Sequence, residues 1–169
     1  MITSLKKGLK EMIPYLILIM VLIFIRLFIV TPVRVDGTSM ENTLQENDIL
    51  ILNKFDYTYE RFDVVVFNYH NQKLIKRVIG LPGEKVEFKN NKLYIDGKYI
   101  KEDFLGSKSS DFSIEDLGYS VIPEDEYLLI GDNREASYDS RYFGTVNKKY
   151  IKGTVNFRLF PFNKIGKFN

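Results

Sequence analysis

Two residues of this chain could form a hydrolytic pair, a serine at position 39 and a lysine at position 76. Ser39 lies in the segment G-T-S-M-E-N-T-L, a few residues after a long apolar run, and Lys76 begins the segment K-R-V-I-G-L-P-G-E. The chain has no cysteine and a single histidine, which leaves few other ways to build a hydrolase. A serine whose proton is taken by a lysine is one of them, because a neutral amine can act as general base.

Composition excludes several other kinds of chemistry. Without cysteine there is no disulfide framework, no thiol nucleophile and no cysteine-based zinc site, and one histidine cannot build a multi-histidine metal cluster. We therefore expect neither a metal nor a cofactor. A Ser-His-Asp triad would have to use His70. That residue lies in N-Y-H-N-Q-K between two apolar runs, a pattern that predicts a hairpin turn, so we favour an ordinary surface role for it.

The surroundings of Lys76 in the sequence suggest how it could become a base. In a strand, Lys76 shares a face with Leu74 and Val78, while Arg77 points to the other face. Apolar neighbours disfavour the charged ammonium and lower the pKa of a lysine. Basic residues in strands are more often solvated, and a serine near a glycine is common, so neither residue is a strong signal alone.

A polar block at residues 131–144, G-D-N-R-E-A-S-Y-D-S-R-Y-F-G, directly follows an apolar strand. It could be no more than a hydrogen-bonded turn with an ion pair between Asp139 and Arg141. Loops at strand ends are also where functional sites are commonly built.

An apolar run of 18 residues, 13–30, is interrupted only by Arg26 and is long enough to span a bilayer as a helix. Pro14 near its start would be tolerated in a first helical turn. A buried soluble helix is the weaker alternative, since no polar stripe crosses the run. A cleaved secretory signal is the stronger one, but no A-x-A-like cleavage site follows. We favour an uncleaved anchor.

Charge separates the two ends of the chain. Residues 1–30 carry four basic side chains against one acidic, whereas residues 31–169 carry 20 basic and 21 acidic. Lysines before the run predict a cytoplasmic N-terminus at residues 1–12, an anchor at 13–30 in contact with membrane lipid, and a domain at 31–169 on the extracytoplasmic face. No basic stripe remains to follow a phosphate backbone, so no nucleic-acid partner is expected.

Beyond the anchor, the sequence predicts a mainly β domain. Short β-branched and aromatic runs are separated by turn residues, and the dipeptides Asn90-Asn91 and Asp96-Gly97 predict two hairpin turns. Residues 101–120 are polar without a clear period and are expected to form a long loop or a small excursion. The predicted architecture is an antiparallel, folded-over β-sheet preceded by a single N-terminal transmembrane helix.

Taken together, these segments resemble bacterial type I signal peptidase in its short Gram-positive form. The resemblance covers nearly the whole chain and keeps the order of the family. The motifs that carry it are the anchor, G-T-S-M-E-N-T-L, R-F-D-V-V-V-F, K-R-V-I-G-L-P-G-E and the block G-D-N-R…S-x-D-S-R-Y-F-G.

The resemblance implies roles for individual residues. Ser39 would be the nucleophile, Lys76 the general base, and Ser137 the residue whose hydroxyl orients the lysine amine. The positions implied to line shallow pockets for small substrate side chains are Met40, Leu44 and Ile75. The positions implied to brace the site through ion pairs are Arg77, Asp139 and Arg141.

Two positions depart from the family pattern. Asn42 stands where the family usually has proline, which would fix φ at the turn after the nucleophile. Gly37 stands where some members have a serine whose hydroxyl helps to bind the oxyanion, although short Gram-positive forms commonly have this glycine. The Ser39 backbone N–H would then carry more of that task.

The resemblance implies a membrane-anchored serine endopeptidase that removes signal peptides from exported preproteins. Two alternatives belong to other classes. Relatives without the dyad are thought to assist pilus assembly, and Asn42 keeps a specialised, pilin-related role open. A self-cleaving Ser/Lys protein of the repressor type would need a DNA-binding module in place of the apolar run.

Overall fold

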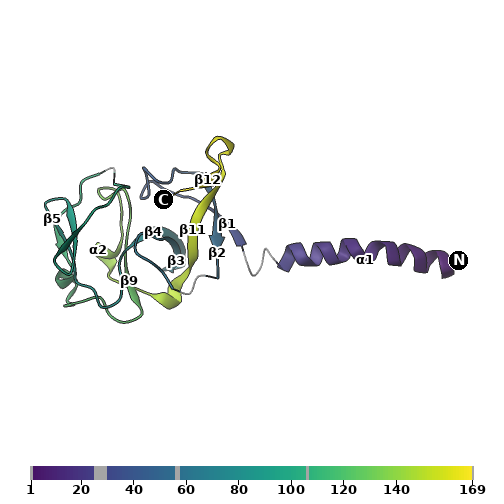
Figure 1. Cartoon of the computed structure of the whole chain (residues 1–169), viewed down its shortest axis with the longest axis horizontal. Helices are drawn as coiled ribbons and strands as arrows, with labels where there is room; N and C mark the ends of the chain where they lie inside the picture. Colours follow the sequence, from purple (N-terminus) through teal and green to yellow (C-terminus); the bar gives the residue numbers. More distant parts are fainter. Residues whose placement is uncertain (1, 25–29, 56–57, 106, 169) are drawn as a thin grey trace.

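The computed structural model describes residues 2–24, 30–55, 58–105 and 107–168, and the strands in these ranges build two antiparallel sheets (Figure 1). The larger sheet consists of β1 (Val30–Arg34), β2 (Ile49–Asn53), β3 (Val64–Tyr69), β4 (Gln72–Gly80), β9 (Glu126–Ile130), β10 (Val146–Asn147), β11 (Ile151–Phe160) and β12 (Gly166–Lys167). The smaller sheet consists of β5 (Val86–Lys89), β6 (Lys92–Ile95), β7 (Lys98–Ile100) and β8 (Phe112–Ser113). The prediction of a mainly β, antiparallel domain is confirmed.

The larger sheet has the strand order β1-β2-β11-β3-β4-β9-β10, with β12 added to β11. β3 and β4 form a hairpin, in which Val65 pairs with Lys76 and Tyr69 pairs with Gln72. His70 and Asn71 form its turn and both have positive φ. His70 is exposed there, as the turn prediction requires.

The long strand β11 joins the two halves of the larger sheet, because it pairs with β2 on one side and β3 on the other. Gly153 lies at a register shift in this strand and has a φ of +144°. A Cβ added to Gly153 would lie 1.9 Å from the Asn53 carbonyl oxygen. The sheet can therefore close at this point only with glycine.

In the smaller sheet, β5 to β7 form the two predicted hairpins. Asn90 and Asn91 make the first turn, Asp96 and Gly97 the second, and all four have positive φ. Residues 101–120, expected to form a long loop or a small excursion, contain two short regular elements in their described part. β8 pairs with β5, and a short 3-10 helix, η2 (Ile114–Leu117), follows with Ser113 as its N-cap.

Buried apolar side chains form three clusters. One lies between the two sheets and includes Ile79, Phe88 and Leu128. The other two belong to the larger sheet. The first of these contains Met40 and Leu44, and the second contains Val65 and Val78. The turn after β1 is thus anchored by apolar packing as well as by the chain on either side of it.

The N-terminal helix α1 (Ile2–Phe24) begins well before the predicted span, so Pro14 lies inside the helix and not in its first turn. Val30, the last residue of the predicted span, begins β1, and residues 25–29, Arg26 among them, lie outside the described residues. The side chains from residue 10 to 24 are exposed. Within the described ranges, no helix has both the length and the mean hydropathy required to cross a membrane.

Candidate active site

Lys76 lies in the middle of β4, and its amine reaches the serine hydroxyl that was predicted as its partner. The Nζ atom of Lys76 donates a hydrogen bond of 2.5 Å to the Oγ atom of Ser39. Lys76 is only 3% exposed, because its strand pairs with β3 and Val65 lies opposite it. The fold therefore joins two residues that are 37 positions apart in the sequence.

Ser39 is held in a tight turn between β1 and β2. The Glu41 N–H donates to the Thr38 carbonyl at 3.0 Å, and the Leu44 N–H donates to the Met40 carbonyl at 2.8 Å. The Ser39 carbonyl itself accepts a 3.1 Å hydrogen bond from the Asn133 N–H. The turn is thus fixed both locally and by the polar block that follows β9.

Burial lowers the pKa of Lys76 from its ordinary value of 10.5 to about 8. The negative charges of Asp139 and Asp132 act in the opposite direction and raise this pKa, while the positive charge of Arg141 lowers it further. At a pKa near 8, about a tenth of the lysine is neutral at pH 7, compared with less than about a thousandth for an exposed lysine. Lys76 can therefore accept a proton near neutral pH.

Ser137 is buried close to this pair, but its hydroxyl does not bond to the lysine in this structure. Within the described residues, the Ser137 Oγ atom has no hydrogen-bond partner. Gly131 separates it from the nucleophile's turn. A Cβ on Gly131 would lie 2.3 Å from the Ser137 Oγ atom and 2.5 Å from the Ser39 carbonyl oxygen. The unpartnered hydroxyl is thus adjacent to the site, and only glycine fits between the two segments.

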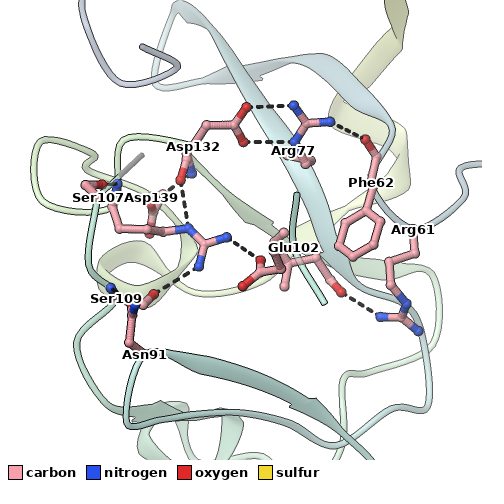
Figure 2. Close-up of polar contacts among 12 residues, drawn as sticks. Arg61, Phe62, Arg77, Asn91, Glu102, Ser107, Ser109, Asp132 and Asp139 are labelled. Atoms are coloured by element: carbon pink, nitrogen blue, oxygen red, sulfur yellow. Dashed lines mark hydrogen bonds and ion pairs between the residues drawn. The ribbon is translucent and has the colours of Figure 1, made fainter. Parts of the chain in front are cut away.

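Arg77 extends to the other face of β4 and forms a buried ion pair with Asp132 (Figure 2). Two parallel hydrogen bonds of 2.8 and 2.6 Å join the guanidinium to the carboxylate. The Thr43 hydroxyl donates to Asp132 at 2.6 Å and accepts from Arg77 at 3.1 Å. This cluster connects β4, the nucleophile's turn and the polar block, so it fixes the positions of all three.

A second ion pair orders the polar block internally. The Arg141 guanidinium donates to both carboxylate oxygens of Asp139 at 2.8 and 2.9 Å. Asp139 also accepts from the Gly131 N–H and caps the short helix α2 (Ser140–Phe143). The pair considered from the sequence is present, and its carboxylate contributes to the negative potential at Lys76.

A third buried pair fastens the neighbouring loop to the same block. Figure 2 shows Glu102 and Ser109 in this region, where both bond to the guanidinium of Arg134. Burial raises the pKa of Glu102, and the charge of Arg134 lowers it. The segment before β8 is therefore ordered by a charge pair, which its polar sequence did not reveal.

A groove of about 240 Å³ leads to Ser39 and Lys76. It is lined by residues 32–37 on one side and 73–76 on the other, and its lining includes Met40 and Ile75. Leu44 is fully buried in the adjoining apolar cluster and does not line the groove here. Because β1 and β4 are separated by three strands in the sheet order, the sheet must curl to bring them to one groove.

Both sides of this groove end in an unpaired strand edge. β1 is the terminal strand of its sheet, and β4 pairs with β9 only from Arg77 onward. In the described chain no strand occupies the second edge of β4 at residues 72–76. Open edges of this kind can pair with an extended peptide.

The two positions that depart from the expected pattern both have positive φ. Asn42 has a φ of +90° and Gly37 a φ of +85°. Proline is restricted to φ near −65°, so it cannot occupy position 42 with this backbone. Asparagine is among the non-glycine residues that tolerate positive φ best. The turn can therefore adopt this backbone with asparagine, and not glycine, at position 42.

Several residues of the site were missed by sequence reasoning. Asp132 and Asn133 belong to the polar block, but nothing in their types shows which partners they reach. Thr43 lies next to the predicted pocket residues and bonds through its hydroxyl. The only available signal was their position, directly after a buried strand or directly after the nucleophile. His70, for which an ordinary surface role was expected, lies at the β3–β4 turn, where its ring packs edge-on against Tyr69.

Among the described residues, no group of three or more His, Cys, Asp or Glu side chains is arranged to hold a metal ion. A serine hydroxyl beside a buried amine is compatible with the chemistry of a serine hydrolase.

Comparison with known proteins agrees with this class. The family model described as "Signal peptidase, peptidase S26" matches residues 9–160. Signal peptidase I of Bacillus amyloliquefaciens is 39% identical, over 98% of this chain and 95% of the relative. Signal peptidase IB of Staphylococcus aureus (strain MRSA252) is 40% identical, over 97% and 95%. The chain therefore belongs to the signal peptidase family, peptidase S26, and is a serine endopeptidase of the signal peptidase I type.

The fold is shared as well. The crystal structure of a signal peptidase I from Enterococcus faecalis V583 is 38% identical in sequence and superimposes with a TM-score of 0.55. The match covers 57% of this chain and 96% of the other.

Proposed function

We propose that this protein cleaves signal peptides from preproteins with a Ser39–Lys76 dyad. The observation that carries the proposal is the 2.5 Å contact between the Lys76 Nζ atom and the Ser39 Oγ atom, together with the burial of Lys76. Membership of the signal peptidase family supports the reaction, and the contact supports the assignment of nucleophile and base.

The reaction is acyl transfer. Ser39 Oγ attacks the scissile carbonyl carbon while neutral Lys76 accepts the hydroxyl proton. The tetrahedral intermediate then collapses, the C–N bond breaks, and Lys76 returns the proton to the departing amine. Lys76 then deprotonates a water molecule, which attacks the ester carbonyl carbon. The bond between that carbon and the Ser39 Oγ atom breaks, and Lys76 returns the proton to Oγ. Ser137 is proposed to orient the amine, since its buried hydroxyl has no other partner in the described chain.

The Ser39 backbone N–H is proposed to bind the oxyanion, because Gly37 offers no hydroxyl. Removal of one preorganised donor of this kind lowers kcat by a factor of about 10²–10³. The Thr38 carbonyl shares a peptide plane with the Ser39 N–H. It accepts hydrogen bonds from the Glu41 N–H at 3.0 Å and from the Asn133 side-chain amide at 3.2 Å, which supports a fixed orientation of this donor.

The substrate is proposed to be a preprotein whose signal peptide enters the groove as an extended strand. The open edges of β1 and β4 would bind its backbone, and alternate side chains would enter pockets. Met40 and Ile75 line the groove, so those pockets are apolar and small. Leu44 contributes by packing in the adjoining cluster. Small residues at the −1 and −3 positions should therefore be preferred.

The protein is further proposed to be anchored by the apolar run at residues 13–30, with residues 1–12 in the cytoplasm and the β domain on the extracytoplasmic face. The support is the length of the run and the excess of lysine before it. Part of this run lies outside the described residues. Preproteins would then meet the groove after translocation. No metal, cofactor or nucleic acid takes part in the proposed reaction.

The test is cleavage of a purified preprotein by the full chain in detergent, followed by sequencing of the new N-terminus. Ser39→Ala and Lys76→Met are each expected to lower kcat/KM by at least about a thousandfold. The double variant should be no worse than either single one, because the two residues act as a unit.

His70→Ala is the matched control, since that residue lies at an exposed turn. Loss of activity in the control with retention in Lys76→Met would refute the dyad. A preprotein with Ala→Phe at −1 should resist processing.

A further inference from the structure

Four lysines surround one hollow at the side of the β domain. Lys54 follows β2, Lys148 and Lys149 form the short helix η3 (Lys148–Tyr150), and Lys152 lies in β11. The hollow has a volume of about 520 Å³, and Asp125 is the one carboxylate in its lining. We refer to these four lysines and the space between them as the basic hollow.

The basic hollow has a clear excess of positive charge. Within the described ranges, none of Lys148, Lys149 and Lys152 forms an ion pair with a carboxylate. Lys149 and Lys152 are exposed. Residues 31–169 carry 20 basic and 21 acidic side chains in total, these four lysines included, so the domain as a whole is nearly neutral. The hollow is thus a local concentration of charge on a nearly neutral domain.

Its position in the sheet is the second observation. Val30, the first residue of β1, pairs with Asn53 of β2, and Asn53 pairs with Thr154 of β11 on its other side. These three residues form one row across the sheet. Lys54 lies one residue beyond this row and Lys152 two residues beyond it. The basic hollow therefore lies at the end of the sheet where the chain arrives from the apolar run.

Exposed aromatic side chains accompany the lysines. Phe55, directly after Lys54, is 53% exposed, and Tyr150, between the lysines of η3 and β11, is 49% exposed. The Lys149 Nζ atom lies 5.0 Å from the centre of the Tyr150 ring. Lysine and aromatic side chains together are the usual composition of a surface at the membrane–water interface, where apolar rings sit at headgroup level.

We propose that the basic hollow docks on anionic lipid headgroups and holds the β domain against the membrane surface. The inference rests on the anchor of the proposed function and adds a second, electrostatic contact to it. Pro32 to Val35 line the catalytic groove and begin two residues after Val30, so docking at this end of the sheet also keeps the groove close to the bilayer. An acidic protein segment is the competing occupant, but it would not need to lie beside the apolar run.

The chain has no tryptophan, so one introduced tryptophan reports on its own surroundings. Tyr150→Trp places the reporter beside the basic hollow, next to Lys149. Tyr99→Trp places the control on β7 of the smaller sheet, at a residue that is 54% exposed. The full-length chain is reconstituted in phosphatidylcholine vesicles, with and without phosphatidylglycerol, that carry a nitroxide on the lipid headgroup. Quenching then measures contact with headgroups.

Quenching of Tyr150→Trp is expected to rise severalfold when phosphatidylglycerol is present. It should decline in high salt, because screening shortens the Debye length from about 10 Å at 0.1 M to about 3 Å at 1 M. Tyr99→Trp should remain unquenched in both lipids. Equal quenching of Tyr150→Trp with and without the anionic lipid would overturn the proposal. A third variant, Phe162→Trp, places the tryptophan between β11 and β12. Quenching of this variant without quenching of Tyr150→Trp would also overturn the proposal, since it would show docking through the β11–β12 hairpin.

Charge variants test the cause. Lys148→Gln, Lys149→Gln and Lys152→Gln combined in the Tyr150→Trp chain should abolish the effect of phosphatidylglycerol. The matched control changes Lys89, Lys92 and Lys98 of the smaller sheet to Gln, all of them exposed, and should leave the effect unchanged. An equal loss in both triple variants would mean that total charge acts rather than the basic hollow, and would overturn the assignment.

Two further readouts separate this proposal from the proposed function. In detergent, the Gln variants of the basic hollow should cleave a preprotein at the wild-type rate, because these residues lie outside the groove. Flotation with vesicles of phosphatidylcholine alone tests the anchor. A chain that floats only with anionic vesicles, and only at low salt, would support the basic hollow and refute the anchor.

Discussion

Lys76 and Ser39 meet at the same point but are held there in different ways. Lys76 belongs to a regular strand that pairs with β3 along its length, and its position follows from backbone hydrogen bonds. Ser39 belongs to a turn that is tied to the rest of the molecule by side chains and single backbone contacts, from Asn133, Asp132 and Arg77. The base is thus positioned by the sheet. The nucleophile's turn is held by the apolar packing of Met40 and Leu44 together with polar contacts that can be removed one at a time.

This difference makes the nucleophile's turn the more vulnerable half of the site. Substitutions in the contacts around the turn should displace Ser39 while leaving Lys76 buried. Activity should then fall. The pKa of Lys76 should stay the same where the substitution removes no charge, as at Thr43, and should fall where it removes the carboxylate of Asp132, whose charge raises that pKa.

The largest effect is expected for Asp132→Asn. Arg77 would keep its charge inside the protein without a counter-charge, which typically costs about 3–5 kcal/mol of unfolding free energy. Asp103→Asn is the matched control, since Asp103 forms an exposed ion pair with Lys101. An exposed pair of this kind is worth about 1 kcal/mol at most. Urea unfolding of both variants measures the two losses, and equal losses would show that the buried pair does not brace the site.

A smaller loss is expected for Asn42→Pro. Proline requires φ near −65°, whereas Asn42 has a φ of +90°, so the turn would have to rebuild at a cost of about 2–3 kcal/mol. Asn42→Gly accepts the present backbone and should stay within about 1 kcal/mol of the wild type. Thermal unfolding and kcat/KM together measure the result. If the proline variant were as stable and as active as the wild type, this turn geometry would be wrong.

The smallest of the three effects is expected for Thr43→Val, which keeps the shape of the side chain and removes its hydroxyl. Asp132 then loses one hydrogen bond and Arg77 another, at a cost of about 1–2 kcal/mol. The Thr43→Ser variant retains the hydroxyl and should recover most of the loss. A decrease in kcat with an unchanged acidic limb of the pH profile would show displacement of Ser39. A shifted limb would mean that Thr43 acts on Lys76 instead.

The sequence predicted the half of the site that lies in regular structure better than the half that does not. The two-residue period of a strand placed Lys76 on the face of Leu74 and Val78, and the structure keeps those two residues in one apolar cluster. Hairpin dipeptides were equally informative, since their backbone preferences are local.

Contacts of the turn could not be predicted in the same way, because they depend on segments far apart in the chain. Thr43 and Asp132 are 89 positions apart, and no periodicity relates them. The conformation of Asn42 was also missed, since an expectation based on proline assumes a φ of the opposite sign. Helix α1 was placed too late, because apolar composition marks a span and not the ends of the helix that contains it.

The central claim is that Lys76 works as a buried, neutral base, and the pH dependence of kcat/KM tests it most directly. This profile reports the ionisation of the free enzyme. Because burial lowers the pKa of Lys76 to about 8, protonation below that pH removes the base. We expect kcat/KM to be level above about pH 8 and to fall tenfold per pH unit below it, with the same profile in His70→Ala. A rate that continued to rise toward pH 10.5, or a midpoint near 6.5 that disappeared in His70→Ala, would contradict the account.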